Sequence, residues 1–274
     1  MGRKRADAET GDADDATRDP RFVAALARGI ELLRAFTPKD RWLSHREIVR
    51  RTALPAATVS RLTFTLTTLG YLKHRKEVGE YALTPAVLGL GFSMLGNFDI
   101  ARIARPTMQA LADKCQAAVS LGARHGLEMI YVAHCRTTAR LILGLDVGAR
   151  LPIARTSMGR AVLCGMPPIE REVLMQRMAL AEGDTWPSVK DRLAQVQAQF
   201  DERGFVTTEG EWDPSISAAA VPVALGDGRT VFGLSVGGAS AWLSGEFLHD
   251  EVGPLLVSAA ATIVDAIHAA DWKD

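Results

Sequence analysis

The chain has 274 residues, of which 47% are hydrophobic and 23% charged, and its formal net charge at pH 7 is zero. This composition is typical of a soluble globular protein with room for two ordinary domains. It argues against a disulfide scaffold, because the three cysteines have no C-x-x-C spacing, and against a membrane protein, because no uninterrupted apolar run approaches the roughly 18 residues of a span. The basic N-terminus has no apolar segment behind it, so we expect no secretory signal.

The zero net charge conceals a basic segment. Residues 21–83 contain 12 Lys and Arg against 5 Asp and Glu, a net charge of +7. Residues 1–20 contain 4 against 6, a charge of −2, and residues 84–274 contain 16 against 21, a charge of −5. A compact basic segment attached to a mildly acidic body favours phosphate binding by one domain over chance clustering.

Residues 1–20 lack the apolar side chains needed for a core, and we interpret them as a disordered tail. From Phe22 the pattern becomes helical, because apolar residues recur at spacings of three and four. These residues are Leu26, Ile30, Leu33 and Phe36.

A pair of helices follows. Ser44 is a good N-cap for the first, because Glu47 lies three residues further on and forms a capping box. Pro55 can occupy the first position of the second helix, for which Gly70 is a natural stop. An apolar stripe on the second helix should face the core, and it consists of Val59, Leu62, Leu66 and Leu69.

A basic hairpin comes next, with a strand from Tyr71, a turn at 78–80 and a return at 81–83. The residues at or near its tip are Lys73, His74, Arg75 and Lys76. The winged helix-turn-helix arrangement consists of these elements in this order: two helices, a turn, a third helix and a basic hairpin. The combination is a more specific signal of this fold than a hairpin alone.

Two connecting helices are predicted, from Thr84 to about Asn97 and from about Ile100 to Cys115. Short β-like runs then mix with helical runs. Strands are predicted at 119–124, 129–134, 139–145, 205–207, 217–223 and 230–236, and helices at 157–164, 169–180, 189–203 and 244–270. A hairpin turn at 226–228 joins the last two strands. Strands flanked by helices predict a sheet with helices packed against it, which suits the sensing of a small molecule.

The second helix of such a motif lies in the major groove and reads base edges with its N-terminal residues. The face opposite its apolar stripe carries Ala56, Ala57, Thr58, Ser60, Arg61 and Thr65. Thr58 can bond a base or touch a thymine methyl, and Arg61 either grips a guanine or holds a phosphate. Ala57 either packs on a thymine methyl or lets the helix come close. We predict an operator with a thymine near the start of this helix.

Other basic residues are expected to contact the DNA backbone. We expect His45 and Arg46 to approach it, and the hairpin residues Lys73, Arg75 and Lys76 to follow the adjacent minor groove or phosphates. For each basic side chain taken alone, the alternative is a solvated surface position.

Six segments carry a resemblance to a known family. In chain order they are RGIELLRAF, LSHREIVRRTALPAATVSRLTFTLTTLGYL, YALTPAVLGLG, ARPTMQALADK, LPIARTSMGRAVLCGMP and AAAVPVALGDGRTVFGLSVGGAS. Over about Phe22 to Ile267 the chain resembles the isocitrate-lyase-regulator (IclR) family of bacterial transcription factors. The TSMGRA stretch looks most like the branches that govern aromatic-acid breakdown. The family's recognition helix often begins with a polar pair such as Lys-Ser, where this chain has Ala56-Ala57.

The resemblance implies an α+β fold of two domains: a winged helix-turn-helix, a linker helix and a GAF-like α/β effector-binding domain. We place the disordered tail at 1–20, the DNA-binding domain at 21–83, the linker helix at 84–98 and the effector-binding domain at 99–274. The resemblance also implies homodimers, often paired into tetramers, on palindromic double-stranded operator DNA. We expect a cytoplasmic bacterial protein that is associated with the nucleoid when bound to DNA and has no membrane partner.

The strand TVFGLSVGG has an informative alternation. Phe232, Leu234 and Val236 point to one face, and Gly233, Ser235 and Gly237 point to the other. Such a row of small residues leaves room beside the sheet either for a ligand or for a closely packed helix. The neighbouring strand also offers small residues, Ala218 and Ala220 on one face or Ser217 and Ala219 on the other.

The segment RTSMGRAV would form the other wall of a pocket. Thr156 can cap a helix that starts at Ser157, and the free N–H groups of its first turn then form an anion site that suits a carboxylate. Arg155 either helps to bind an acid or points outward, and Arg140 and Asp213 are further candidates. The effector contacts that the family resemblance implies fall on Thr156, Ser157, Met158, Ala218, Ser235 and Gly237.

A different class of function is open to the same strand. Residues 233–237 match G-x-S-x-G, the nucleophile-elbow pattern of a serine hydrolase that would use Ser235. The elbow needs a sharp strand-to-helix turn after the serine, whereas here the apolar strand continues and the next helix begins near Ser244. Cys164 at an apolar helix end is a poor thiol nucleophile, and the spacing of His125, His134 and Cys135 is a weak metal signal.

We therefore expect no catalytic residue, no metal and no cofactor. The leading hypothesis is a sequence-specific transcriptional repressor or activator whose operator affinity is set by a small, anionic organic acid.

Overall fold

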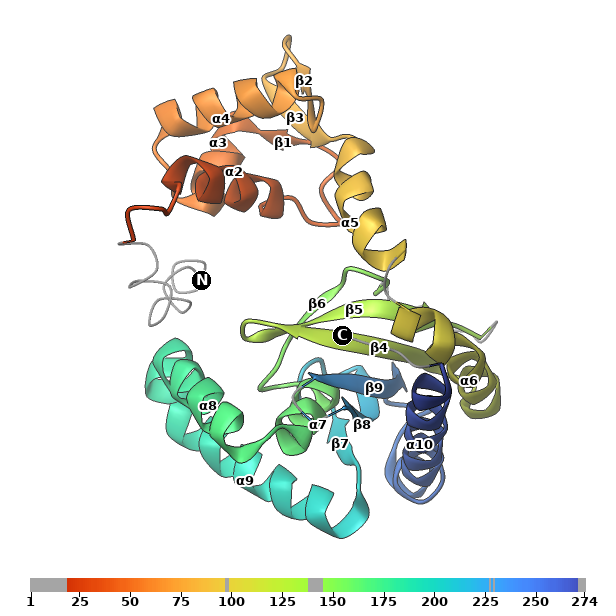
Figure 1. The fold of residues 1–274 in the computed structure, drawn as a ribbon. Helices are drawn as coiled ribbons and strands as arrows, with labels where there is room; N and C mark the ends of the chain where they lie inside the picture. The colour runs from red at the N-terminus through yellow and green to blue at the C-terminus, as the bar shows by residue number, and fades with distance from the viewer. Residues whose placement is uncertain (1–18, 97–98, 138–144, 227, 229, 271–274) are drawn as a thin grey trace. The chain divides into compact units, whose positions relative to one another are not determined.

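The structure is a computed structural model that describes residues 19–96, 99–137, 145–226, 228 and 230–270. These residues form two compact units, and the division falls between residues 96 and 99 (Figure 1). Residues 1–18 of the predicted tail and 139–144 of a predicted strand lie outside the described residues.

The first unit contains α2 (Ala24–Arg34), α3 (His45–Thr52), α4 (Ala56–Thr68) and α5 (Ala86–Gly96). The Ser44 hydroxyl accepts a hydrogen bond of 3.2 Å from the Glu47 N–H and caps α3, as predicted. Gly70 follows α4 with a φ of +80°, which is the predicted stop. Pro55 lies one position earlier than predicted, because it is the N-cap of α4 and Ala56 is the first helical residue.

A three-stranded antiparallel sheet completes the winged helix-turn-helix. Its strands are β1 (Leu43–Ser44), β2 (Leu72–Arg75) and β3 (Glu80–Leu83), in the order β1-β3-β2. The β2–β3 hairpin confirms the predicted one. β1 has no counterpart in the prediction, because two residues are too few to show alternation.

The core of the first unit consists of six buried side chains: Leu32, Leu43, Ile48, Val59, Leu66 and Leu72. The apolar pattern of the first helix identifies α2 but not its buried side, because Leu26 is 64% exposed and Ile30 is 50% exposed. The predicted stripe of α4 is wrong at Leu69, which is 63% exposed at the helix end. Thr63 is buried instead, and its hydroxyl has a partner because it donates to the Val59 carbonyl at 2.9 Å.

Part of the positive charge of this unit is paired with carboxylates of the same unit. Arg51 donates hydrogen bonds to the Asp40 and Glu47 carboxylates and to the Ala35 carbonyl. The Arg51 guanidinium holds the pKa of Asp40 well below its usual range. Hydrogen bonds from Arg50 and Arg51 lower the pKa of Glu47 to about 2. Arg51 therefore stabilises the junction of α2 and α3.

The turn between α3 and α4 holds Ala53 in the left-handed region, with a φ of +55°. A Cβ in that region costs roughly 1–2 kcal/mol, whereas glycine loses roughly 0.5–1 kcal/mol more entropy on folding. We therefore expect Ala53→Gly to stabilise the protein by about 0.5–1 kcal/mol in urea unfolding. Gly70→Ala, at a φ of +80°, is the matched reverse change and should destabilise. Equal unfolding midpoints for the two variants would contradict strain at Ala53.

The second unit is built on a six-stranded antiparallel sheet of order β6-β5-β4-β9-β8-β7. Its strands are β4 (Ala118–His125), β5 (Glu128–Cys135), β6 (Arg150–Pro152), β7 (Val206–Glu209), β8 (Ile216–Leu225) and β9 (Thr230–Ala239). All except the short β6 correspond to predicted runs. The pairing of Leu225 with Thr230 confirms the β8–β9 hairpin, although Asp227 in its turn lies outside the described residues.

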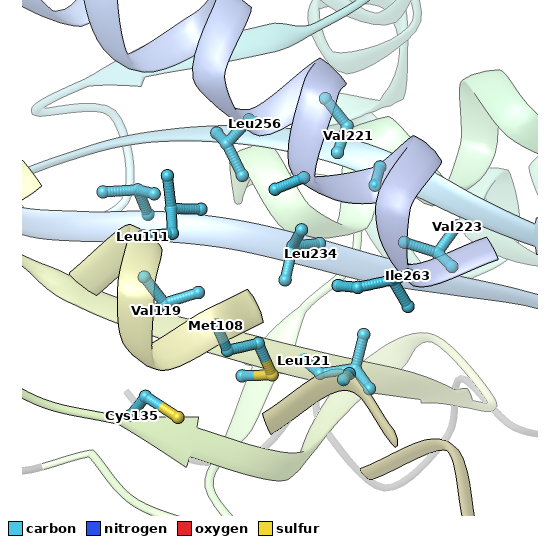
Figure 2. Packing of buried hydrophobic residues seen from close by; sticks show 14 of the residues in the cluster. Met108, Leu111, Val119, Leu121, Cys135, Val221, Val223, Leu234, Leu256 and Ile263 are labelled. Atoms are coloured by element: carbon cyan, nitrogen blue, oxygen red, sulfur yellow. The ribbon is translucent and has the colours of Figure 1, made fainter. Parts of the chain in front are cut away.

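Helices cover both faces of this sheet (Figure 1). One face packs against α6 (Asp99–Cys115) and α10 (Gly253–Ala269), and the other against α7 (Ser157–Gly165), α8 (Pro168–Glu182) and α9 (Trp186–Arg203). Figure 2 shows the first of these layers, where Met108 and Leu111 of α6 and Leu256 and Ile263 of α10 surround Leu234 of β9. The small-residue face of β9 is turned to α7.

The C-terminal helix, Phe247–Ala269, begins with a π-helical turn at Phe247–Val252. By length and composition alone this helix could cross a membrane. Its residues Leu248, Val252, Leu256 and Ile263 are buried in the core beneath the sheet. An apolar helix with such a buried face is typical of a domain core.

Candidate DNA-reading and effector sites

The face of α4 opposite the core carries the predicted base-reading residues. Ala56, Ala57, Ser60 and Arg61 are exposed, and Thr58 is half-buried. Within the described residues Arg61 forms no ion pair. Its guanidinium is therefore available to a base or a phosphate.

His45 connects α3 to this face. It is the first residue of α3, and its Nε2 atom lies 3.0 Å from the Ser60 Oγ of α4. The structure thus brings together two predicted residues that are 15 positions apart. The next residue, Arg46, is exposed.

The basic residues of the wing fall into two groups. Lys73 and Arg75 lie two positions apart on β2, and both cover the Trp42 ring. The Lys73 Nζ is 5.0 Å and the Arg75 Cζ 3.9 Å from the ring centroid. Lys76 lies beyond the strand and is exposed. Trp42 is not among the residues predicted from the sequence, because it is far from the hairpin along the chain.

In the second unit, paired residues form three rows on the sheet face toward α7. The first row joins Gly122 of β4 to Gly233 of β9. A Cβ at Gly122 would come within 2.3 Å of the Met158 Sδ, and one at Gly233 within 2.5 Å of the Met158 Cγ. The small residues of this row admit a closely packed helix, which is one of the two predicted alternatives.

The second row joins the buried side chains of Ser120 and Ser235. Burial raises the pKa of Tyr131, and its hydrogen bonds with Ser120 and Ser235 oppose that rise. The Ser120 Oγ also lies 2.8 Å from the His134 Nδ1, and burial lowers the pKa of His134. We call Ser120, Tyr131, His134 and Ser235 the polar cluster. Because its groups are uncharged at neutral pH, it can bond a neutral polar group without a charge penalty.

The third row joins Ala118, Gly237 and Ala218. All three residues are half-buried. A Cβ at Gly237 would meet no heavy atom nearer than 3.7 Å. This row has space for a methyl group beside the sheet, so the close helix packing is limited to the first row, and the ligand alternative stays a prediction for the third.

The first turn of α7 lies against this sheet face through Met158. Thr156 is the N-cap, and its hydroxyl accepts from the Gly159 N–H at 3.2 Å and donates to the Pro152 carbonyl at 3.0 Å. Ser157 and Met158 are buried, and in the described part of the chain their N–H groups have no acceptor. Free N–H groups at a helix N-terminus favour an anion.

Two arginines flank this turn. The Arg155 Nη2 lies 2.8 Å from the Glu182 carboxylate of α8 and its side chain is half-exposed, which is the outward alternative. Arg160 is buried, and it donates to the Ala154 carbonyl at 2.9 Å and to the Glu211 carboxylate at 2.8 Å. Burial lowers the pKa of Arg160, and the bond to Glu211 opposes this. Arg160 is not among the residues predicted from the sequence.

The structure gives no support to the hydrolase alternative. Ser235 lies in the middle of β9, which continues through Ala239. Val236 and Gly237 remain paired with β4, so no strand-to-helix turn follows the serine. His249 of the C-terminal helix bonds the Glu209 carboxylate at 3.1 Å.

Other candidates do not join the site. Burial raises the pKa of Cys164 to about 11, so its thiolate is scarce at neutral pH. Asp213 accepts from the Ser215 N–H at 2.9 Å within a turn, and Arg140 lies outside the described residues. Among the residues that the structure describes, no three His, Cys, Asp or Glu side chains gather as a metal site would require.

A winged helix-turn-helix with an exposed second helix, followed by a separate α/β unit, is typical of a DNA-binding regulator with a sensory domain. The IclR helix-turn-helix domain matches residues 25–76, and the C-terminal domain of bacterial IclR transcriptional regulators matches residues 92–265. The chain belongs to the IclR family of transcriptional regulators.

Individual relatives agree with this. The chain is 30% identical to the HTH-type transcriptional regulator TsaQ1/TsaQ2 of Comamonas testosteroni, over 91% of this chain and 90% of the relative. The crystal structure of an IclR family regulator from Brucella abortus is similar, with 38% identity, a TM-score of 0.81 and coverage of 91% and 94%. An IclR homologue from Microbacterium hydrocarbonoxydans, crystallised with 4-hydroxybenzoate, has the same fold, with 21% identity, a TM-score of 0.70 and coverage of 90% and 100%. The comparisons confirm the predicted family, its two-domain α+β fold and its regulatory function.

Proposed function

We propose that this regulator binds palindromic operator DNA as a homodimer, or as a tetramer of two dimers, and that a small organic acid sets its operator affinity. It acts by binding and not by catalysis, in the bacterial cytoplasm and on the nucleoid when bound to DNA. Residues 21–83 form the DNA-binding domain, 84–98 the linker helix and 99–274 the effector-binding domain.

In this proposal α4 reads the operator. Thr58 and Arg61 contact base edges, and Ala56 and Ala57 let the helix approach a thymine methyl closely. His45 and Ser60, joined by their hydrogen bond, present polar groups beside that helix. Arg46 and the wing residues Lys73, Arg75 and Lys76 contact phosphates.

The observation that carries the effector proposal is the pair of buried N–H groups at Ser157 and Met158 without an acceptor among the described residues. A carboxylate would supply both acceptors and is favoured by the helix dipole. Thr156 shapes this turn, and Ala218, Ser235 and Gly237 border the open end of the sheet face.

The ligand class that fits best is an aromatic acid. Its ring can lie on the small residues of the third row, and a ring hydroxyl can bond the polar cluster. The 4-hydroxybenzoate in the homologue from Microbacterium hydrocarbonoxydans, which has a carboxylate and a hydroxyl at opposite ends of a ring, supports this class.

The acid must favour one arrangement of the two recognition helices over another, because a ligand shifts an equilibrium only by its differential affinity. The linker helix α5 is the proposed lever, since it sets the spacing of those helices in a dimer.

A thermal-shift screen against small carboxylates, with 4-hydroxybenzoate among them, tests the sensor. We expect one compound class to raise the unfolding temperature, since a ligand at 100 times its Kd stabilises by about 2.7 kcal/mol. Ser235→Ala should reduce that shift, while the control Ser258→Ala, on the exposed side of α10, should keep it. If no carboxylate gives a shift, the sensor proposal fails; if Ser235→Ala keeps the full shift, the assignment of Ser235 fails.

A further inference from the structure

The outer face of the wing sheet carries a stacked arrangement of one indole and two cations. Leu43, Leu72 and Tyr81 of this sheet pack against the core of the first unit. Because side chains alternate along a strand, Ala82 points to the opposite face, where it pairs with Lys73. Ala82 is nevertheless only 4% exposed. The Trp42 ring, over which Lys73 and Arg75 lie, belongs to this face as well.

The register explains how Trp42 reaches this position. Leu43 pairs with Tyr81 in the antiparallel β1–β3 ladder, so Trp42, one residue earlier, falls opposite Ala82. Ala82 in turn is the partner of Lys73 on β2. By this register Trp42 continues the row that Ala82 and Lys73 form across the sheet, and the middle residue of that row is small.

Both cations lie over the Trp42 ring. A cation within about 6 Å of an indole centroid is attracted by the ring, and Lys73 and Arg75 lie at 5.0 and 3.9 Å. A Glu80 carboxylate oxygen 3.9 Å from the Arg75 Nη1 adds a second restraint. An arginine that stacks through its flat face keeps its N–H edge available, and that edge is what binds a phosphate.

We propose that Trp42 is a positioning residue for DNA binding, which holds Lys73 and Arg75 on the outer face of the wing so that both reach neighbouring phosphates together. This inference rests on the proposed DNA contact of the wing. Long cationic side chains lose rotamer freedom when they bind, and restricting them beforehand raises affinity without adding a contact to the DNA. Lys76, which lies over no aromatic ring in the described part of the chain, supplies the matched control.

The experiment measures binding of the full-length protein to a short fluorescent duplex of random sequence, over a series of salt concentrations. Phosphate contacts do not depend on sequence, so no operator is needed. We expect Trp42→Ala to weaken binding by roughly threefold to tenfold, and Trp42→Phe, which keeps a weaker ring, to restore part of it. The salt slope should stay unchanged, because the contacts still form, although less readily.

A double-mutant cycle separates positioning from a damaged wing. Replacing Lys73 and Arg75 by glutamine should lower the salt slope by roughly 2. In that background we expect Trp42→Ala to change affinity less than twofold, whereas in a Lys76→Gln background it should keep its full effect. Equal effects in both backgrounds, or no effect of Trp42→Ala on the otherwise unchanged protein, would overturn the proposal.

The same titrations separate this inference from the proposed function. If the unsubstituted protein does not bind the duplex even at low salt, DNA binding itself fails, and the role of Trp42 fails with it. If the unsubstituted protein binds and Trp42→Ala binds equally well, the proposed function stands and only the role of Trp42 is lost.

Discussion

Replacing Thr58 and Arg61 together by alanine is expected to weaken binding to the operator by roughly 30- to 1,000-fold, because the two side chains are the best-placed hydrogen-bonding groups on the exposed face of α4. A bidentate base contact from Arg61 contributes about 1–3 kcal/mol and a single hydrogen bond from Thr58 about 1 kcal/mol, so the pair should contribute about 2–4 kcal/mol. The operator can be selected from a pool of random duplexes, and the affinities compared by electrophoretic shift.

The control for this change keeps the same residue types on the same unit. Arg28→Ala combined with Thr68→Ala removes an exposed arginine of α2 and an exposed threonine near the end of α4, and should leave operator binding within about twofold. The Thr68 hydroxyl donates to the Phe64 carbonyl within its own helix, so its proton is not available to a base. If the Thr58 and Arg61 double variant bound its operator as tightly as this control, α4 would not be the reading helix.

Arg61→Ala by itself decides between the two roles of that residue. Loss of a guanine contact should relax specificity at one base position, with little change in salt dependence. Loss of a phosphate contact should weaken binding to all duplexes alike and lower the salt slope by about 1. Base-substituted operators at several salt concentrations give both quantities, and they also test the thymine predicted near Ala57.

The sequence predicts the local signals of this fold well, because each depends on a few neighbouring residues. Ser44 caps α3, Gly70 ends α4, and both hairpins form at their predicted turns. The prediction fails where distant parts of the chain decide. β1 and β6 are strands only because β3 and β5 lie beside them, and α2 buries Leu32 because its apolar residues extend around more than one side.

In the candidate effector site too, the sequence predicts some features and not others. Alternation along β9 correctly separates Leu234, in the core, from Ser235, on the α7 face. Alternation cannot place Tyr131, because a register shift between Leu121 and Gly122 changes which residues of β5 face α7. The role of Arg160 could not be predicted either. Its partners Ala154 and Glu211 lie in two loops that are far apart in the chain, and they meet only in the folded domain.

The second large prediction concerns Gly159 and the loop that precedes its helix. The loop from β6 to α7 lies directly on the first turn of the helix, and a Cβ at Gly159 would come within 2.2 Å of the Ile153 carbonyl oxygen and 2.4 Å of its Cα. These are backbone atoms, which cannot move aside as the end of a side chain can. Gly159→Ala must therefore separate the loop from the helix.

We expect Gly159→Ala to destabilise the second unit by about 3 kcal/mol, even though alanine gains roughly 1 kcal/mol over glycine in helix propensity. For a domain of this size that is a fall of about 6–12 °C in unfolding temperature. Gly237→Ala is the control, because its new Cβ meets nothing nearer than 3.7 Å, and it should unfold within about 2 °C of the unsubstituted protein. Scanning calorimetry of the full chain measures both.

The two glycines also separate stability from sensing. Gly159→Ala should abolish the thermal shift caused by the carboxylate, because it displaces the N–H groups of Ser157 and Met158 from the sheet face. Gly237→Ala should fold normally but reduce that shift, because its methyl group occupies the open third row beside Ala218. If Gly159→Ala matched Gly237→Ala in stability, the first turn of α7 would not be held by the loop. The proposed anion site would then lose the rigid support on which its selectivity depends.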